Sequence, residues 1–330
     1  MSPVRPVRRR LVAAAAALPA ASLAPRAVRA QAWPSKPIRV IVPYAAGGTS
    51  DILARTLGVR VGEALGVQVV VENKPGANGV LGTDLVAKAA PDGHTVLIAD
   101  VGGITSAPAL VPTLPFQPLR DLAPVTMLTW SPHLLVVGPQ VAARTLAELV
   151  AAAKAKPGAL NAATTGSGGA PHLAAALLAR RAGIDWGYVP YKGGAQALND
   201  LAAGQADLMF NGMLATLPFV QGGKLRALAL AGDRRWPSLP ELPTVAEQGF
   251  PGFMTGSWQG VLAPAGTPAA AIARLAAEFE KALAVPEVSQ RLTAQGAEPR
   301  TGPPAEFAAF LKADTERWAQ LVKETGIKAE

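Results

Sequence analysis

Short apolar runs, glycine-rich turns and segments with helical periodicity follow one another along the chain. The first apolar run, residues 38–42, has the length and composition of a buried strand. The small-residue turn 45–51 follows it, and from Leu53 to Leu65 an apolar residue recurs every four positions. This spacing predicts a helix that begins near Asp51. The stretch therefore predicts a strand that passes through glycines into the N-terminus of a helix.

The same order of elements continues along the chain. Two successive strand–helix–strand units between residues 38 and 99 imply a parallel sheet with helices on both faces. The strand-like segment 125–137, interrupted by Ser131 and Pro132, is predicted to cross into a second domain. Further strands are predicted at 67–71, 95–99, 160–164, 187–191, 206–210, 225–231 and 255–263, and further helices at 80–89, 145–156, 171–181, 195–203, 268–284, 286–295 and 304–325. The pattern indicates an α/β protein of two domains.

A second glycine-rich turn, 165–171, lies between a predicted strand and a predicted helix in the same arrangement as the first. The first N–H groups of a helix have no acceptor within the helix, and the helix dipole adds positive potential at that end. Such an N-terminus binds anions. The two turns, one in each predicted domain, can therefore face each other across a cleft and hold a carboxylate through backbone N–H groups.

The side chains of the two turns are small and mostly uncharged. Neither turn contains Lys or Arg, so the predicted site carries little charge and selects its ligand by shape. Hydroxyl groups come from Thr49, Ser50, Thr165 and Ser167 and can donate or accept hydrogen bonds. Asp51 has two interpretations: it caps its own helix, which we favour, or it points into the cleft. In the cleft it would repel a second acidic group of the ligand or attract an ammonium group.

A third candidate segment follows the predicted strand 95–99. Residues 102–105 are expected at the carboxyl edge of the sheet, where open α/β sheets bind their ligands. Asp100 lies beside them and does not suit an anion site. We therefore interpret Asp100 as a helix cap or turn acid.

The charge of the chain depends on its N-terminal segment. The 330 residues carry a formal net charge of +8, but residues 1–30 contain six Arg and no acid. Without them, 25 basic residues stand against 23 acidic ones. The charge therefore gives no ground for predicting nucleic-acid binding.

Residues 1–30 have the organisation of an export signal. The basic run Arg8–Arg10 precedes the apolar segment 11–23, and Val28-Arg29-Ala30 resembles a cleavage site, with a cut after Ala32 as an alternative. The arginine run also resembles a twin-arginine signal, so either a Sec or a twin-arginine signal is predicted. The chain contains no Cys, which excludes disulfides, thiol catalysis and lipid anchoring through Cys. A periplasmic location is expected.

An enzymatic alternative depends on Ser167 and His172, which could serve an exported serine hydrolase. The residue two positions before Ser167 is Thr165 and not the Gly of a G-x-S-x-G turn, and the two other histidines, His94 and His133, stand alone. No metal-binding motif is present, and the glycine spacing at 76–82 does not match a dinucleotide site. We therefore expect no enzymatic activity, no metal and no cofactor.

Several segments together resemble the Bug-type solute receptors of tripartite tricarboxylate transporters. These segments are Trp33 to Tyr44 (WPSKPIRVIVPY), Gly47 to Asp51 (GGTSD) with Ala54 and Arg55, Val71 to Gly79 (VENKPGANG), Pro91 to Thr95 (PDGHT), Tyr191 to Gly194 (YKGG) and Gly204 to Asp207 (GQAD). The resemblance spans essentially the whole chain after the export signal. One departure concerns the segment after the third strand, where the family has a Thr/Gly-rich stretch with a His and this chain has Asp100-Val101-Gly102-Gly103-Ile104.

The resemblance implies a type II periplasmic binding protein, with two doubly wound α/β domains joined by two crossing strands. Domain 1 would combine residues 33–130 with about 252–330, and domain 2 would span about 131–251. A small carboxylate or dicarboxylate would bind between the domains, partly through bridging waters, for delivery to a membrane transporter of the tripartite type or to a sensor protein. A monomer is expected.

The family's ligand-binding loops map onto the two glycine-rich turns of this chain, with Tyr191 as a further wall. The ligand-binding residues implied in this way are Tyr44, Ala46, Gly47, Gly48, Thr49, Ser50, Asp51, Thr165, Gly166, Ser167, Gly168, Gly169 and Tyr191.

Overall fold

The computed structural model describes residues 33–327, which form an α/β structure around one ten-stranded sheet. In its first half, β1 (Ile38–Val42) pairs in parallel with β2 (Val69–Asn73) and β3 (Thr95–Ala99). Helices α1 (Thr49–Leu65) and α2 (Val80–Ala87) connect these strands. The predicted parallel strand–helix–strand units are thus confirmed.

Strands β9 (Gly256–Pro264) and β10 (Glu298–Pro299) and the first part of β4 (Leu122–Val137) complete this half of the sheet. Strand β9 pairs antiparallel with β3 and with the first part of β4, and the short β10 also pairs with β4. We call this half, with its helices, lobe 1. Its remaining helices are α3 (Ala107–Leu110), α4 (Pro118–Asp121), α9 (Ala269–Ala284), α10 (Pro286–Ala294) and α11 (Pro304–Thr325).

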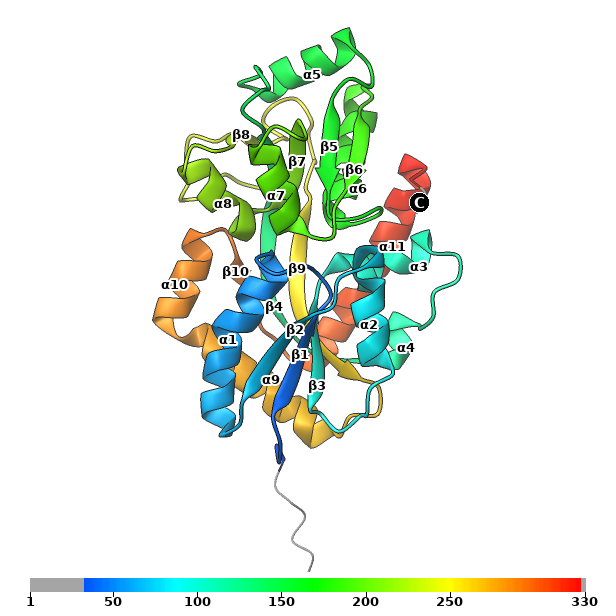
Figure 1. Ribbon diagram of the computed structural model, residues 1–330, viewed down its shortest axis with the longest axis vertical. Coiled ribbons are helices and arrows are strands. Elements are labelled where there is room, and N and C mark those ends of the chain that lie inside the picture. The colour runs from blue at the N-terminus through cyan, green and yellow to red at the C-terminus, as the bar shows by residue number, and fades with distance from the viewer. Residues whose placement is uncertain (1–32, 328–330) are drawn as a thin grey trace, which may run out of the picture. The chain divides into compact units, whose positions relative to one another are not determined.

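The second half of the sheet, which we call lobe 2, begins where β4 changes partners. From His133 onward β4 pairs antiparallel with β7 (Leu208–Gly212) and β8 (Arg226–Leu230). Strand β5 (Asn161–Thr164) lies parallel between β7 and β6 (Gly187–Pro190). The helices of lobe 2 are α5 (Leu146–Ala155), α6 (Ala170–Ala182), α7 (Gly194–Ala202) and α8 (Met213–Gln221). Figure 1 shows β4 passing from one lobe into the other.

The predicted break of the crossing strand at Ser131 and Pro132 is wrong. Strand β4 is continuous for 16 residues because Pro132 lies where the strand leaves β9 and joins β7. A proline removes one N–H donor, and that loss costs little at a change of partners. The Ser131 hydroxyl donates a hydrogen bond to the carbonyl of Gly296 (2.7 Å).

Helix α8 was not predicted from the sequence. Its residues are mostly apolar and include Pro218, so no amphipathic period marks it, and tertiary packing decides its conformation. Most of the other predicted elements are present, with ends shifted by up to three residues. The predicted export signal lies outside the described residues. Within residues 33–327, no helix has the length and apolar character needed to cross a membrane.

Aromatic side chains gather on the side of the crossing strands where β10 pairs. Trp130, Trp236 and Trp258 line a cavity of about 340 Å³ there, and the guanidinium carbon of Arg300 lies 5.4 Å from the Trp130 ring centroid. Trp236 extends from lobe 2 and donates a hydrogen bond from Nε1 to the carbonyl of Thr293 (2.9 Å). Trp236 therefore connects the two lobes.

Candidate functional site

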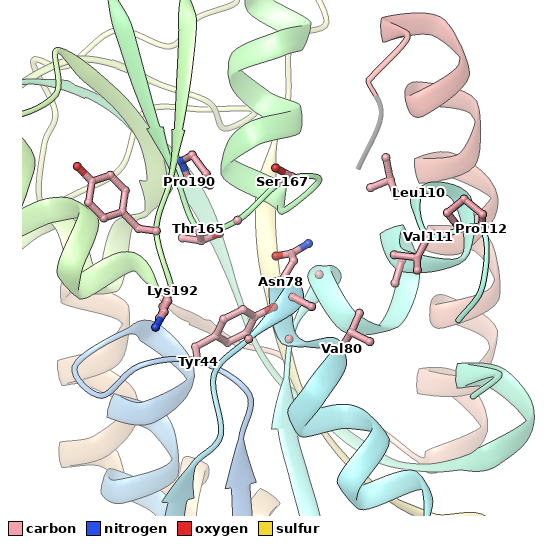
Figure 2. A pocket seen from close by; sticks show the side chains of 17 residues that line it. Tyr44, Asn78, Val80, Leu110, Val111, Pro112, Thr165, Ser167, Pro190 and Lys192 are labelled. Carbon is pink, nitrogen blue, oxygen red and sulfur yellow. The ribbon is translucent and has the colours of Figure 1, made fainter. Parts of the chain in front are cut away.

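Loops at the carboxyl ends of strands from both lobes enclose a cavity of about 570 Å³, the large cavity, shown in Figure 2. Lobe 1 supplies Tyr44, Gly76, Ala77, Asn78, Gly79, Val80, Gly102, Ala107, Leu110, Val111 and Pro112. Lobe 2 supplies Thr165, Gly166, Ser167, Pro190, Tyr191 and Lys192. This position agrees with the rule that open α/β sheets bind ligands beyond the carboxyl ends of their strands.

A second, smaller space of about 30 Å³, the small cavity, shares Tyr44 and Thr165 with the large one. Its walls include the N-terminal residues of four helices, α1 in lobe 1 and α6, α7 and α8 in lobe 2. These residues are Gly48, Thr49 and Ser50 at α1, Pro171 at α6, Gly194 at α7 and Gly212 at α8. The helix N-termini contribute positive potential to this space, against the Asp100 carboxyl, which also lines it. Its volume suits one water molecule or one carboxylate oxygen and excludes a whole ligand.

The N-terminus of α1 has unsatisfied donors. Gly48 is the N-cap and has no side chain to accept a hydrogen bond, and no acceptor among residues 33–327 bonds the N–H groups of Thr49 and Ser50. The Ser50 hydroxyl donates to Oε1 of Gln259 (2.6 Å). The buried amide nitrogen of Gln259 has no hydrogen bond of normal geometry in the described chain, although it lies close enough to Asp100 to lower that carboxyl's pKa. Unpaired buried donors are costly, so this arrangement favours an acceptor from outside the chain.

Asp51 lies in neither cavity. Its carboxylate accepts hydrogen bonds from the N–H of Gly47 (2.9 Å), from Nε of Arg55 (3.1 Å) and from Nδ2 of Asn73 (2.9 Å). Burial alone raises the pKa of Asp51, but these donors together hold it below its ordinary value. Asp51 therefore fixes the turn before α1. This is close to the favoured interpretation of Asp51 as the cap of its own helix, although the N-cap residue is Gly48.

Asp100 lies at the small cavity and is bound to Tyr44. Its Oδ1 accepts hydrogen bonds from the Tyr44 hydroxyl and from the N–H of Gly102 (3.1 Å). Burial raises the pKa of the Asp100 carboxyl, against the two hydrogen bonds, which lower it. Burial and the Asp100 charge raise the pKa of Tyr44 well above its ordinary value. A turn acid was predicted here, and its contact with Tyr44 follows from the pairing of β1 with β3.

The glycine-rich turn of lobe 2, residues 165–171, differs from the turn before α1 in which backbone N–H groups it leaves without an acceptor. The N–H of Gly168 donates to Nδ1 of His172 (2.9 Å), and the N–H of Gly169 donates to the carbonyl of Gly166 (3.2 Å). Among the described residues, no acceptor bonds the N–H groups of Gly166 and Ser167. The first part of this turn is thus the part that can bind a ligand.

The arrangement of His172 does not support the hydrolase alternative. His172 is buried, packs against Tyr188 and uses Nδ1 to accept the Gly168 N–H. Within residues 33–327, no hydrogen bond joins it to Ser167, and burial lowers its pKa to about 4. A catalytic serine needs a base within hydrogen-bond distance, so Ser167 and His172 do not form such a pair.

The two lobes touch around the cavities. The N–H of Ala45 donates to the carbonyl of Lys192 (3.3 Å), and the Ser106 hydroxyl donates to the carbonyl of Gly168 (3.0 Å). Glycine permits this close approach, because a Cβ built on Gly168 would lie 2.2 Å from Cδ1 of Leu110 in the opposite lobe. The structure therefore has the lobes in contact, with the two cavities between them.

The predicted ligand-binding residues divide into three groups. Those on the large cavity are Tyr44, Thr165, Gly166, Ser167 and Tyr191, and those on the small cavity are Tyr44, Gly48, Thr49, Ser50 and Thr165. The residues on neither cavity are Ala46, Gly47, Asp51, Gly168 and Gly169. A Cβ added to Gly47 or Gly168 would meet a side chain of the opposite lobe. The structure thus brings the two predicted turns together, but around two spaces and not one.

Sequence analysis missed one side of the large cavity. The turn 76–80 follows β2 and therefore lies at the same carboxyl edge as the two predicted turns. Ala77 and Asn78 have positive φ angles of 46° and 51°, a strained conformation that is frequent at ligand-binding sites. Lys192 adds a cation to the wall, so the expectation of a site with little charge is wrong at this point. The signal available in the sequence was the position of these residues directly after strands.

No metal site accompanies these cavities. In the described part of the chain, no group of three or more His, Asp or Glu side chains is placed to hold a metal ion. The lining consists of hydroxyl, amide and apolar groups with a single lysine, which suits a small organic ligand.

Comparison with known proteins identifies close relatives of the chain. Residues 53–327 match the family described as "Tripartite tricarboxylate transporter family receptor". The chain is 40% identical over 324 residues to the "UPF0065 protein in tcbD-tcbE intergenic region" of Pseudomonas sp. (strain P51), covering 98% of this chain and 96% of that protein. It is 38% identical over 306 residues to "Protein BugT" of Bordetella pertussis, covering 91% and 93%.

Solved structures agree with this relationship. A "periplasmic transporter" superimposes with a TM-score of 0.88 at 38% identity, covering 91% of this chain and 100% of the other. Rpa4515 of R. palustris, solved with adipate, gives 0.87 at 34% identity over 90% and 100%, and MatC of Rhodopseudomonas palustris, solved with malate, gives 0.84 at 35% over 88% and 100%. The predicted periplasmic binding fold and the resemblance to Bug-type receptors are therefore confirmed. The chain belongs to the tripartite tricarboxylate transporter family of receptors, which are periplasmic solute-binding proteins and not enzymes.

Proposed function

We propose that this protein binds a small carboxylate between its two lobes, with the carboxylate at the boundary of the large and small cavities. The observation that carries the proposal is the N-terminus of α1. Its Thr49 and Ser50 line a space bounded by three further helix N-termini, and their N–H groups have no acceptor among the described residues. Oriented N–H groups and helix dipoles stabilise an anion without a cationic side chain. Two related proteins were solved with adipate and with malate, both of which are carboxylates.

Tyr44 and Thr165 line both cavities and would flank the bound carboxylate. The small cavity would hold a carboxylate oxygen or a bridging water, and the N–H groups of Gly166 and Ser167 would bind from the opposite lobe. Lys192, which has no ion pair among residues 33–327, adds long-range attraction for an anion.

The division into domains at about residues 131 and 252 is part of the proposal. The partner change of β4 at His133 and the return of the chain through Thr255 into β9 support it. Ligand binding would stabilise the contact between the lobes, and release would follow a hinge motion about these crossing segments. The closed form would then be recognised by a membrane transporter of the tripartite type or by a sensor protein in the periplasm.

A proline at position 49 tests the role of the α1 N–H groups. Thr49→Pro removes one N–H donor at the first helical position, where proline fits, and Gly48 already has the extended conformation (φ −79°, ψ 171°) that precedes proline. The matched variant Thr49→Ala loses the hydroxyl but keeps the N–H. We expect Thr49→Pro to bind carboxylates about tenfold or more weakly than Thr49→Ala, since a hydrogen bond to a charged group contributes about 1.5–3 kcal/mol.

The measurement is a thermal-shift screen of a carboxylate panel, followed by titration calorimetry of the best ligand with both variants. The proposal requires stabilisation of the wild-type protein by at least one carboxylate and a difference between the two variants. Equal affinities of Thr49→Pro and Thr49→Ala, with both folded, would show that the α1 N-terminus does not bind the ligand.

Asp100 should weaken anion binding, and its replacement should strengthen it. A bound carboxylate raises the pKa of Asp100 further above its ordinary value of 3.8, so the complex holds more protons than the free protein. Affinity should therefore fall as pH rises through the raised pKa of Asp100. Asp100→Asn keeps acceptors for Tyr44 and Gly102 but carries no charge, so we expect about tenfold tighter binding above that range and a flat pH profile.

Calorimetric titrations of both proteins across a pH series check this expectation. Weaker binding by Asp100→Asn would instead indicate that Asp100 contacts a cationic or hydroxyl group of the ligand.

A further inference from the structure

We infer that the ligand is a monocarboxylate with an apolar body, an aliphatic chain or a ring, and not a dicarboxylate with an acidic group at each end. The inference rests on the proposed function and specifies the class of ligand for the same site. It follows from the unequal chemistry of the two sides of the large cavity.

One side of the large cavity is polar. Figure 2 shows Tyr44 and Lys192 on this side, with Thr165 nearby. Tyr44 and Thr165 also border the small cavity, where the α1 N-terminus lies. A carboxylate bound here finds N–H donors and the only cationic side chain among the described lining residues.

The other side is apolar. Leu110, Val111 and Pro112 lie opposite Lys192 in Figure 2, and Val80 and Ala107 continue the same wall. Val80 and Ala107 also belong to a small hydrophobic cluster with Phe116, so this wall is continuous with packed apolar side chains. Asn78 and Ser167, which lie between the two sides, are neutral and can bond a hydroxyl or carbonyl group without balancing a charge.

Three positions on the apolar side offer no free backbone N–H to a second acid. The N–H of Gly79 donates to the carbonyl of Gly76 (3.0 Å), the N–H of Val111 donates to the carbonyl of Ala107 (2.9 Å), and Pro112 has no N–H. A second carboxylate on this side would lose water and gain neither a cation nor these hydrogen bonds. Burial of a charge without a partner is strongly unfavourable, whereas a methyl group or ring edge there gains from leaving water.

The volume of the cavity fits the same class. About 570 Å³ lies within the range of sites that enclose whole organic ligands, and such sites combine an apolar lining with a few polar groups that fix orientation. In this protein the polar groups are collected on one side. The site therefore suits a molecule with one acidic end.

Matched pairs of acids test the inference directly. Calorimetric titration of the wild-type protein at pH 7.5 would compare hexanoate with adipate, and 4-methylbenzoate with terephthalate. Each pair shares its carbon skeleton length and differs in the second carboxylate. For each pair with measurable binding, we expect the monoacid to bind at least about tenfold more tightly than the diacid.

Two variants of Val111 test whether the apolar body of the ligand, its tail, lies on the apolar side of the large cavity. Val111 is half-buried on the apolar side, so Val111→Lys introduces a cation there, and Val111→Met provides a control of similar length without charge. Val111→Lys should shift the ratio of adipate to hexanoate affinity about tenfold towards adipate, and Val111→Met should leave that ratio unchanged.

The possible outcomes separate this inference from the proposed function. Diacids that bind the wild-type protein as tightly as the matched monoacids, with Thr49→Pro weakening both, would overturn the inference and leave carboxylate binding intact. An unchanged ratio in Val111→Lys would overturn the placement of the tail. Failure of every carboxylate to bind would overturn both proposals.

Discussion

Replacement of Asp314 by alanine is expected to lower the free energy of unfolding by about 3–5 kcal/mol, the largest effect of any single substitution considered for this protein. Asp314 is buried on α11, and its Oδ2 accepts hydrogen bonds from the hydroxyl of Thr105 (2.7 Å) and from Nε1 of Trp258 (2.8 Å) and Trp318 (2.9 Å). Its Oδ1 accepts two more from Arg317. Alanine would leave these donors without an acceptor, and unpaired buried polar groups are costly.

The consequence extends to the proposed ligand site, because Thr105 belongs to the π-helical turn Gly102–Ser106, which carries Gly102 on the wall of the large cavity. Urea unfolding of Asp314→Ala should be compared with Glu316→Ala, an acid-to-alanine change at an exposed position of the same helix, which should change stability by no more than about 0.5 kcal/mol. Similar unfolding midpoints for the two variants would contradict the structural role assigned to Asp314.

Gly168→Ala is expected to weaken ligand binding by about tenfold or more while Gly158→Ala leaves it unchanged. Both glycines lie in lobe 2 and have nearly the same positive φ, +79° and +73°, so alanine introduces similar backbone strain at each. They differ in their surroundings. A Cβ at Gly158 meets nothing within 4 Å, whereas a Cβ at Gly168 would lie 2.2 Å from Cδ1 of Leu110 in lobe 1.

The strain therefore cancels in the comparison, and the remaining difference reports on the contact between the lobes. An overpacked contact costs about 1–3 kcal/mol, and here it would oppose the closed form that encloses the ligand. Thermal unfolding should show similar losses of stability for both variants, and calorimetry should show a loss of affinity only for Gly168→Ala. Equal affinities of the two variants would show that the Leu110 side chain moves aside without a loss of free energy, or that binding does not require this contact.

The sequence was sufficient to predict the two turns that meet at the site. Each lies between an apolar strand and a helix, and chain direction alone places both at the carboxyl edge of the sheet. Local pattern also predicted most strands and helices. It failed at α8 and at Pro132, where tertiary contacts and not local periodicity determine the conformation.

The chemistry of the site depends on contacts that no local pattern contains. Asp100 meets Tyr44, 56 positions earlier, only because β3 pairs with β1, and Gln259 meets Ser50 only because β9 lies beside β3. The separation of the site into two cavities, and the apolar side supplied by residues 107–112, likewise depend on how the lobes pack. The polar residues of the two turns were accessible to sequence analysis, whereas the groups expected to decide which acid binds were not.

The tryptophans at the crossing strands give the protein an optical signal of its own. Trp130, Trp236 and Trp258 border one cavity beside the strands that join the lobes, and Trp236 bonds a carbonyl of the opposite lobe. Indole emission responds to local polarity and to nearby charges such as the Arg300 guanidinium. Rotation of one lobe against the other would alter these surroundings, so unlabelled protein should report ligand capture through its intrinsic fluorescence.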